Sequence, residues 1–318
     1  MPTNNIIDRT DTGTGTGTLV PDAERREILK SLPAASTVLA LARTVNMSTK
    51  VEKQPVLSTL PSAYWVNGDT GLKQTTEAQW ANKTITAEEL AVIVPVPENL
   101  LADSAYDIFG ELRPEIVAAL GVKLDQAVLF GTDKPASFET AVTDAAIAAG
   151  NTINVSATGD DASDISSVMG KVEEDGFEVS GFAARMRLKG RLRNLRDTSG
   201  APIYSPSLTS GTPASLWGEN IVYSDANGAW RTEGIDLIAG DWSKLVVGVR
   251  QDITFKLFTE GVITNDAGAV VLNLMQQDSV ALRVVARYGF TVANPINRMN
   301  QVAATRYPFA ILETAEGS

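Results

Sequence analysis

The clearest pattern along the chain is a strict alternation of apolar and polar residues in its last third. Residues 252–257 alternate in this way, and residues 282–288 repeat the pattern with arginines at the polar positions. Successive side chains of a strand point to opposite faces, so each segment buries one face and exposes the other. The pattern predicts antiparallel strands at 245–249, 253–258, 270–274 and 280–292.

A second spacing predicts one long helix. Apolar residues recur every four positions at Leu112, Ile116, Leu120, Leu124 and Val128. This spacing places them on one face of a helix. Pro114 suits the first position of a helix and Gly131 suits its end, so we expect a helix over 114–130. A shorter amphipathic helical segment is expected at 104–112, and the apolar stripe is expected to pack on the sheet.

Residues 46–90 form an excursion with few apolar side chains. The segment is rich in Thr, Ser, Gln and Asn, with a turn signal at Asn67-Gly68 and strand character at 56–57, 64–66 and 84–94. An isolated hairpin is marginal in water, so this one needs a surface to lie on. Either it folds back on its own domain, or it lies over a neighbouring subunit with Trp65 and Trp80 as anchors.

The remaining segments complete an α+β layout. Residues 1–20 contain a Thr-Gly repeat at 11–18 and predict a flexible arm, followed by a short helix at 22–32. Between the long helix and the late strands, patterns predict helices at 161–175 and 189–196, a strand at 182–188 and a hairpin turn at 225–228. The main domain is therefore expected to be discontinuous in sequence.

Composition narrows the function classes. The chain has 318 residues, no Cys and no His. These absences remove thiolate nucleophiles, Cys-ligated zinc, the usual general base and the commonest metal ligand, and they make an enzyme less expected. A net charge of -11 disfavours general binding of nucleic acid. No stretch approaches the ~20 apolar residues of a membrane helix.

A run of cations stands out against the acidic background. Its members are Arg185, Arg187, Lys189, Arg191, Arg193 and Arg196. The run could contact DNA or an acidic neighbour, such as the helix that contains Glu173, Glu174 and Asp175. The alternative is a solvated face with partial pairing, because exposed ion pairs are individually weak.

Five phrases, in the right order, resemble the major capsid proteins of tailed bacteriophages with the Hong Kong 97 type of fold. The phrases are residues 75–80 leading into 84–95, residues 97–131, the turn LRDTSGAPIY at 195–204, LWG at 216–218 before Ile221, and GDW at 240–242 leading into 246–250. The resemblance covers nearly the whole chain after the arm. It adds a specific fold and a function to the α+β layout.

The resemblance implies a fold with named parts. Residues 1–45 would be the N-terminal arm and short helix, and 46–90 the extended loop, a β-hairpin that overlaps the next subunit. Residues 91–132 and 236–300 would form the peripheral domain with the long "spine" helix 114–130 and the long antiparallel strands. Residues 133–235 and 301–318 would form the axial domain.

The resemblance also implies the function and the partners. Copies would assemble into hexamers and pentamers of an icosahedral head that encloses double-stranded DNA, in the virion, after assembly in the host bacterial cytoplasm. Separate scaffolding, portal and decoration proteins would be partners, DNA would be contacted weakly and non-specifically, and no membrane, cofactor, metal or catalytic residue is expected. The candidate subunit-interface residues are Trp65, Lys73, Trp80, Glu173, Glu174, Arg187, Arg191 and Arg193.

Some relatives join Lys to Asn covalently between subunits. The excursion offers Lys50, Lys53 and Lys73, and the late segment offers Asn294, Asn297 and Asn300. None of them can be matched residue by residue to that chemistry, so we expect no crosslink.

Three alternatives remain open. A bacterial encapsulin-type nanocompartment shell shares the fold, although the length of the loop and the Thr-Gly arm favour the phage. A carboxylate-based hydrolase of glycans would need two carboxylates ~5 to ~9 Å apart in a pocket. A phage tail or decoration protein is disfavoured by the long helix beside long strands.

Overall fold

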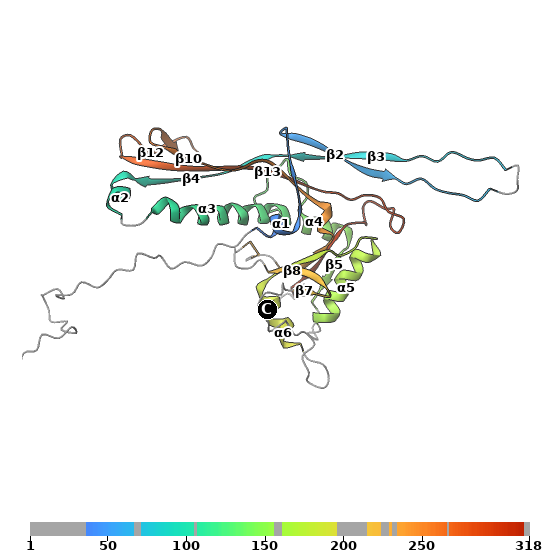
Figure 1. The fold of residues 1–318 in the computed structure, drawn as a ribbon. Coiled ribbons are helices and arrows are strands. Elements are labelled where there is room, and N and C mark those ends of the chain that lie inside the picture. The colour runs from blue at the N-terminus through green and yellow to red at the C-terminus, as the bar shows by residue number, and fades with distance from the viewer. Residues whose placement is uncertain are drawn as a thin grey trace, which may run out of the picture.

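The computed structural model describes residues 36–66, 71–104, 107–155, 161–195, 215–223, 229–230, 234–265 and 267–314. Figure 1 shows a long, thin layer of strands with a helix beneath it, and a second, compact body below the middle of this layer. One hairpin projects far beyond both. The predicted arm 1–20, the helix 22–32 and the turns at 67–68, 196–204 and 225–228 lie outside the described residues.

The thin layer is built on a four-stranded sheet in the order β1-β10-β13-β4. Its strands are β1 (Arg43–Asn46), β4 (Glu88–Pro97), β10 (Leu245–Phe258) and β13 (Ser279–Val292). β13 pairs antiparallel with β10 and β4, whereas β1 pairs parallel with β10. Leu282 and Val284 are buried against the long helix. The alternating pattern therefore predicted the long strands correctly, and at 282–288 also their buried face. The buried face predicted at 252–257 is wrong for Phe255 and Leu257, which are exposed, because the alternation shows which face is apolar but not whether another element covers it.

The long helix begins earlier than the sequence predicted. α3 (Ile108–Asp125) starts at Asp107, whose side chain accepts a hydrogen bond from Gly110 N at 2.9 Å, and Pro114 lies inside the helix. The prediction that Pro114 starts the helix is wrong, because the Asp107 cap begins it one and a half turns earlier. A π-helical turn (Gln126–Phe130) continues α3, and Gly131, at a φ of 72°, ends it.

The compact body contains a six-stranded sheet in the order β5-β14-β9-β6-β8-β7. The strands are β5 (Thr152–Asn154), β6 (Gly181–Ala184), β7 (Ser215–Leu216), β8 (Glu219–Tyr223), β9 (Ile235–Gly240) and β14 (Phe309–Glu313). Its helices are α4 (Val142–Ala149), α5 (Asp161–Glu174) and α6 (Met186–Asn194). The strand predicted at 182–188 ends at Ala184, because α6 begins two residues later.

β9 corrects the expected domain boundary at residue 236. It lies between β14 and β6 in the six-stranded sheet, not with the long strands that follow it in the sequence. The chain crosses between the two bodies only after Gly240, through the 3₁₀ turn Trp242–Lys244. Trp242 and Trp230 are fully buried in a core that contains residues of both sheets, such as Phe290 and Phe309. The two bodies therefore share one apolar core.

Three smaller elements complete the described fold. α1 (Thr37–Leu41) packs beside α3, and α2 (Glu98–Asp103) follows β4 at the far end of the thin layer. β11 (Val262–Thr264) and β12 (Val270–Asn273) form a small hairpin at the same end, between β10 and β13.

Candidate assembly surfaces

The projecting hairpin is formed by β2 (Val51–Thr59) and β3 (Gln79–Thr86). Its paired part runs from Val51↔Thr86 to Thr59↔Gln79, and its outer part has no strand among the residues described there. From here on, "the arm" means residues 51–86, which are a different segment from the N-terminal arm predicted at 1–20. The strand expected at 64–66 is therefore absent, although the expected hairpin is present.

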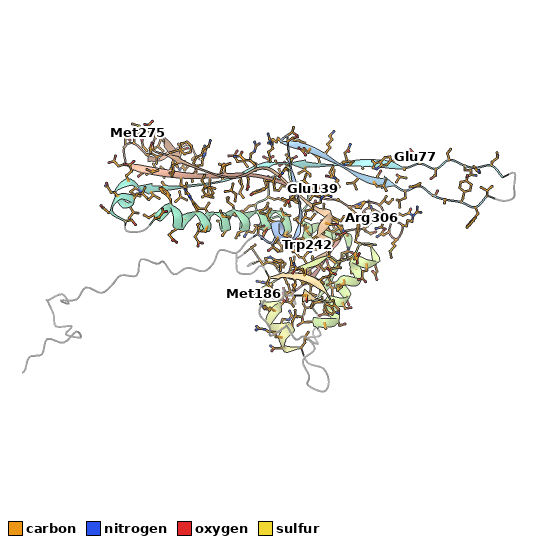
Figure 2. All side chains as sticks on the ribbon, in the orientation of Figure 1. Glu77, Glu139, Met186, Trp242, Met275 and Arg306 are labelled. Atoms are coloured by element: carbon orange, nitrogen blue, oxygen red, sulfur yellow. The ribbon has the colours of Figure 1, made fainter. Side chains whose placement is uncertain are left out.

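Apolar side chains on the arm are left exposed by the other residues that the structure describes. Trp65 is 100% exposed, Leu72 is 90% exposed and Trp80 is 67% exposed, and Lys73 is exposed beside Leu72. Figure 2 shows Glu77 on this outer part, well away from the two sheets. The outer part of the arm does not fold back on its own domain, and that interpretation is wrong for the residues described there. Its two tryptophans are free to contact another molecule.

The base of the arm crosses the four-stranded sheet at very close range. Gly248 and Gly289 face each other on β10 and β13, below Met47 and Ile85. A Cβ atom at Gly289 would lie 2.4 Å from the carbonyl oxygen of Thr86. The absence of side chains at this pair therefore lets the backbone of the arm lie directly on the sheet, which sets the direction in which the arm leaves the body.

We predict that Gly289→Ala destabilises the subunit by about 1–3 kcal/mol, the usual cost of overpacking a close contact. The Thr86 backbone cannot move away without shifting the arm. Gly248→Ala is the matched control, because its new Cβ would meet the Sδ atom of Met47, which a change of rotamer can move. Thermal unfolding of both variants tests this prediction. An equal loss of Tm in the two variants would contradict the backbone explanation.

An ion pair and several hydrogen bonds also hold the near half of the arm. Lys83 Nζ donates to Glu139 Oε1 at 3.0 Å, and Glu139 Oε2 accepts from Thr291 Oγ1 at 2.8 Å and from Val292 N at 3.1 Å. Figure 2 shows Glu139 where the arm meets the compact body. The role of Glu139 was not predictable from the sequence, because a lone Glu in a loop carries no pattern. The near half of the arm is fixed, whereas its outer part is exposed.

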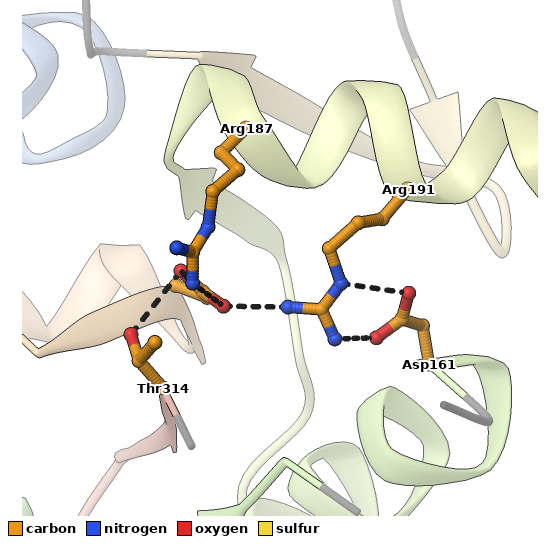
Figure 3. Close-up of polar contacts among 5 residues, drawn as sticks. Asp161, Arg187, Arg191 and Thr314 are labelled. Atoms are coloured by element: carbon orange, nitrogen blue, oxygen red, sulfur yellow. Dashed lines mark hydrogen bonds and ion pairs between the residues drawn. The ribbon is translucent and has the colours of Figure 1, made fainter. Parts of the chain in front are cut away.

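Two members of the cation run, Arg187 and Arg191, form ion pairs with carboxylates of their own chain (Figure 3). Arg191 donates to Asp236 Oδ2 at 2.7 Å and to both oxygens of Asp161, and Arg187 lies 3.4 Å from Asp236. Asp236 is completely buried on β9, and Thr314 also donates to it. Arg187 and Arg191 therefore fasten α6 to the sheet and to the start of α5, and these ion pairs lie within one chain.

The acidic residues named with the cation run lie at the other end of α5. Glu173 and Glu174 are exposed, whereas Asp175 is buried and accepts hydrogen bonds from Asn151, Asn300 and the backbone of Tyr307. The described contact between α5 and the cation run is through Asp161, at the opposite end of the helix. Glu173 and Glu174 stay candidate interface residues.

A second exposed apolar surface lies at the end of the thin layer opposite the arm. Figure 2 shows Met275 there. Four apolar side chains of β11, β12 and the turn that follows them are more than half exposed, namely Val262, Val270, Val271 and Met275. We call this group the apolar tip. A cluster of exposed apolar side chains marks an interaction site more often than scattered ones do. The sequence analysis did not single these residues out.

The described residues offer no support for carboxylate catalysis. A cavity of about 170 Å³ is lined by Glu88, Glu89 and Asp133. Hydrogen bonding from Ser137, helped by Lys50, lowers the pKa of Glu88, and a hydrogen bond from Lys123 lowers the pKa of Asp133. A general acid needs a raised pKa. Within the described ranges, no group of three His, Cys, Asp or Glu side chains could hold a metal ion.

The three asparagines considered for crosslinking all take part in hydrogen bonds. Asn294 exchanges hydrogen bonds with Arg306, and Asn297 and Asn300 donate to Asp175. Burial lowers the pKa of Arg306, and Asp175 acts against this shift. These residues therefore have a structural role in holding the segment after β13. Among the described helices, none is long and apolar enough to cross a membrane.

The geometry defines a class of protein. A thin layer exposes an apolar surface at each end, and one of these surfaces is carried on an arm that its own fold leaves uncovered. Exposed apolar surfaces at both ends are typical of a subunit that packs against other protein surfaces, as a shell protein must.

Comparisons with known proteins then identify the family. Residues 16–297 match the family model described as Phage capsid family. The chain is 28% identical over 271 residues to the major capsid protein of Staphylococcus phage 80alpha, covering 84% of this chain and 79% of that protein. The chain belongs to the phage capsid family, the major capsid proteins of tailed phages, which form the capsid of the virion.

Solved structures agree in fold. A chain from Microbacterium phage Oxtober96 is 40% identical with a TM-score of 0.82, over 93% of this chain and 96% of that one. A chain from Mycobacterium phage Adephagia is 32% identical with a TM-score of 0.81, over 99% and 100% of the two chains. The predicted Hong Kong 97-type α+β fold and the predicted capsid function are therefore confirmed.

Proposed function

We propose that copies of this chain assemble into hexamers and pentamers of an icosahedral head that encloses double-stranded DNA. The observation that carries the proposal is the arm, whose Trp65 and Trp80 are left exposed by the described part of the chain. Trp is the residue type most enriched among side chains that dominate binding energy at interfaces. A neighbouring subunit beneath the arm would bury both side chains. Assembly is proposed to take place in the host bacterial cytoplasm.

The role we propose is structural and not enzymatic, without a cofactor. Lys73, Arg193, Glu173 and Glu174 are exposed and can take part in polar contacts between subunits, whereas Arg187 and Arg191 would act indirectly by holding α6 in place. The net charge of -11 suits a surface that lies near DNA and binds it weakly. Separate scaffolding, portal and decoration proteins are the further partners we propose.

Electron microscopy of the expressed chain tests the proposal. We expect closed shells, or rings of five and six subunits, at micromolar concentration. The content of the particles then separates the phage head from a nanocompartment, because a compartment would hold a cargo protein and not DNA. A chain that stays monomeric at all concentrations, both alone and together with the other head proteins of its phage, would contradict the proposal.

A further inference from the structure

An apolar cavity opens beside the point at which the described chain begins. It has a volume of about 300 Å³ and lies between α1, the middle of α3, and the strands β10 and β13. Its apolar walls include Leu39, Val117, Leu120, Leu124 and Ile253. Leu39 and Val117 are 37% and 41% exposed. The cavity is therefore a hollow with an apolar rim open to solvent, and its volume is enough for more than one large apolar side chain.

The chain is fixed firmly at the mouth of this cavity. The buried carboxylate of Asp125 accepts a hydrogen bond from Ser36 Oγ at 2.5 Å. It also accepts from the backbone N–H groups of Thr37 at 2.8 Å and Val38 at 3.1 Å. A Cβ atom at Gly121 would lie only 3.3 Å from the Cβ of Ser36, so the missing side chain lets residue 36 lie against α3. The preceding residues therefore start from a fixed point at the cavity wall.

The sequence directly before Ser36 contains apolar side chains that could fill the cavity. The pattern at 22–32 predicts a helix that Pro33 ends, with Ile28, Leu29 and Leu32 as its large apolar residues. Leu32 precedes Ser36 by four residues, and a fully extended chain spans at most about 14 Å over that distance. The apolar end of the segment cannot lie far from the cavity.

We propose that Ile28, Leu29 and Leu32 dock in this cavity of their own chain. Docking would cover the exposed sides of Leu39 and Val117 and would join the start of the chain to α1, α3 and the sheet at once. The charged residues Glu27 and Lys30 would then face solvent. The proposal concerns one chain, so it does not depend on assembly of the shell.

Disulfide trapping on the full-length chain tests the docking. The natural chain has no Cys, so Leu32→Cys with Val117→Cys gives the only two thiols. Docking would bring them together at an effective concentration of about millimolar, and mild oxidation should consume both thiols in a species of monomer size. Lys30→Cys with Val117→Cys is the matched control and should react at least about fivefold more slowly. Equal rates for the two pairs would overturn the docking.

Mixing the single-cysteine variants shows whether the docked segment comes from the same chain or from a second copy of it. If Leu32→Cys chains crosslink with Val117→Cys chains into dimers, while the double variant gives no product of monomer size, the occupant is a second copy and the proposal for the same chain is wrong. Equal Tm values of the reduced variants would show that the substitutions leave the fold intact.

Proteolysis gives a second, independent measurement. Trypsin should cleave after Lys30 more slowly than after Arg9, because only the first site lies in the docked segment. Val117→Lys should speed cleavage after Lys30 severalfold and leave the rate at Arg9 unchanged. Ile93→Lys, on an exposed part of β4, is the control and should change neither rate. Unchanged cleavage after Lys30 in Val117→Lys would overturn the proposal.

Discussion

A subunit with a shortened arm is expected to fold and to fail in shell assembly. The change replaces residues 58–79 with Asn-Gly, which removes Trp65, Leu72 and Lys73. Leu57 and Trp80 are direct cross-strand partners, and Asn-Gly is the preferred two-residue turn between such a pair. Losing one Trp contact of at least about 2 kcal/mol per subunit should raise the concentration needed for assembly by more than about thirtyfold.

The shortened subunit should keep its stability, because the removed residues bury little. All described residues of the outer arm from 61 to 66 and from 72 to 77 are exposed. The hydrogen bond from Ile296 N to Leu57 O and the ion pair between Lys83 and Glu139 are retained, and the hydrogen bond from Arg298 to Pro61 O that is lost is exposed. We expect Tm to change by less than ~3 °C. Circular dichroism, thermal unfolding and electron microscopy on the same sample measure both parts of the prediction.

A substitution at full length provides the control. Trp65→Ser keeps the length and pairing of the arm and removes one side chain, so it should weaken assembly without abolishing it at high concentration. If the shortened subunit forms normal particles at the concentration at which the natural chain does, the arm does not lie over a neighbour and the proposed role of Trp65 is wrong.

The fold was predictable where a repeated spacing of apolar side chains along the sequence determines whether a segment forms a strand or a helix. The alternation around Phe255 and Tyr288 gave β10 and β13, and the four-residue spacing from Ile116 to Val128 gave the long helix. Patterns do not state where an element starts. The Asp107 cap outweighed the preference of Pro114 for a first position, and β9 joined the six-stranded sheet through pairing partners far away in the sequence.

The assembly surfaces were predictable only in part, for a physical reason. Trp65 stands out in a polar segment, so its exposure follows from local sequence. The apolar tip consists of ordinary strand residues such as Val270 and Val271, and only the fold shows that nothing covers them. Arg191 and Arg193 lie two residues apart on α6, and the sequence does not distinguish them. Only the fold shows that Arg191 lies beside the carboxylates of Asp161 and Asp236.

Arg191→Met is expected to cause the largest loss of stability among single substitutions of the cations of α6. Asp236 is completely buried, and Arg191 is its nearest cation, at 2.7 Å. Without it, the carboxylate keeps the cation of Arg187 at 3.4 Å and the hydroxyl of Thr314 at 3.3 Å, and an under-compensated buried charge costs about 3–5 kcal/mol. Because the side chain of Arg191 is 26% exposed, we expect the lower end, about 3 kcal/mol, and a fall in Tm of about 5–10 °C.

Arg193→Met is the matched control, two residues away on the same helix. Arg193 is exposed, so its loss should change the free energy of unfolding by less than about 0.5 kcal/mol. Asp236→Asn combined with Arg191→Met should cost at least about 1 kcal/mol less than the sum of the two single changes, because the pair loses both charges together. Additive effects, or equal losses in Arg191→Met and Arg193→Met, would mean that the buried pair does not hold α6 on the sheet. A separate outcome concerns assembly. If Arg193→Met leaves Tm unchanged but impairs shell assembly, the exposed side of α6 lies at a contact between subunits.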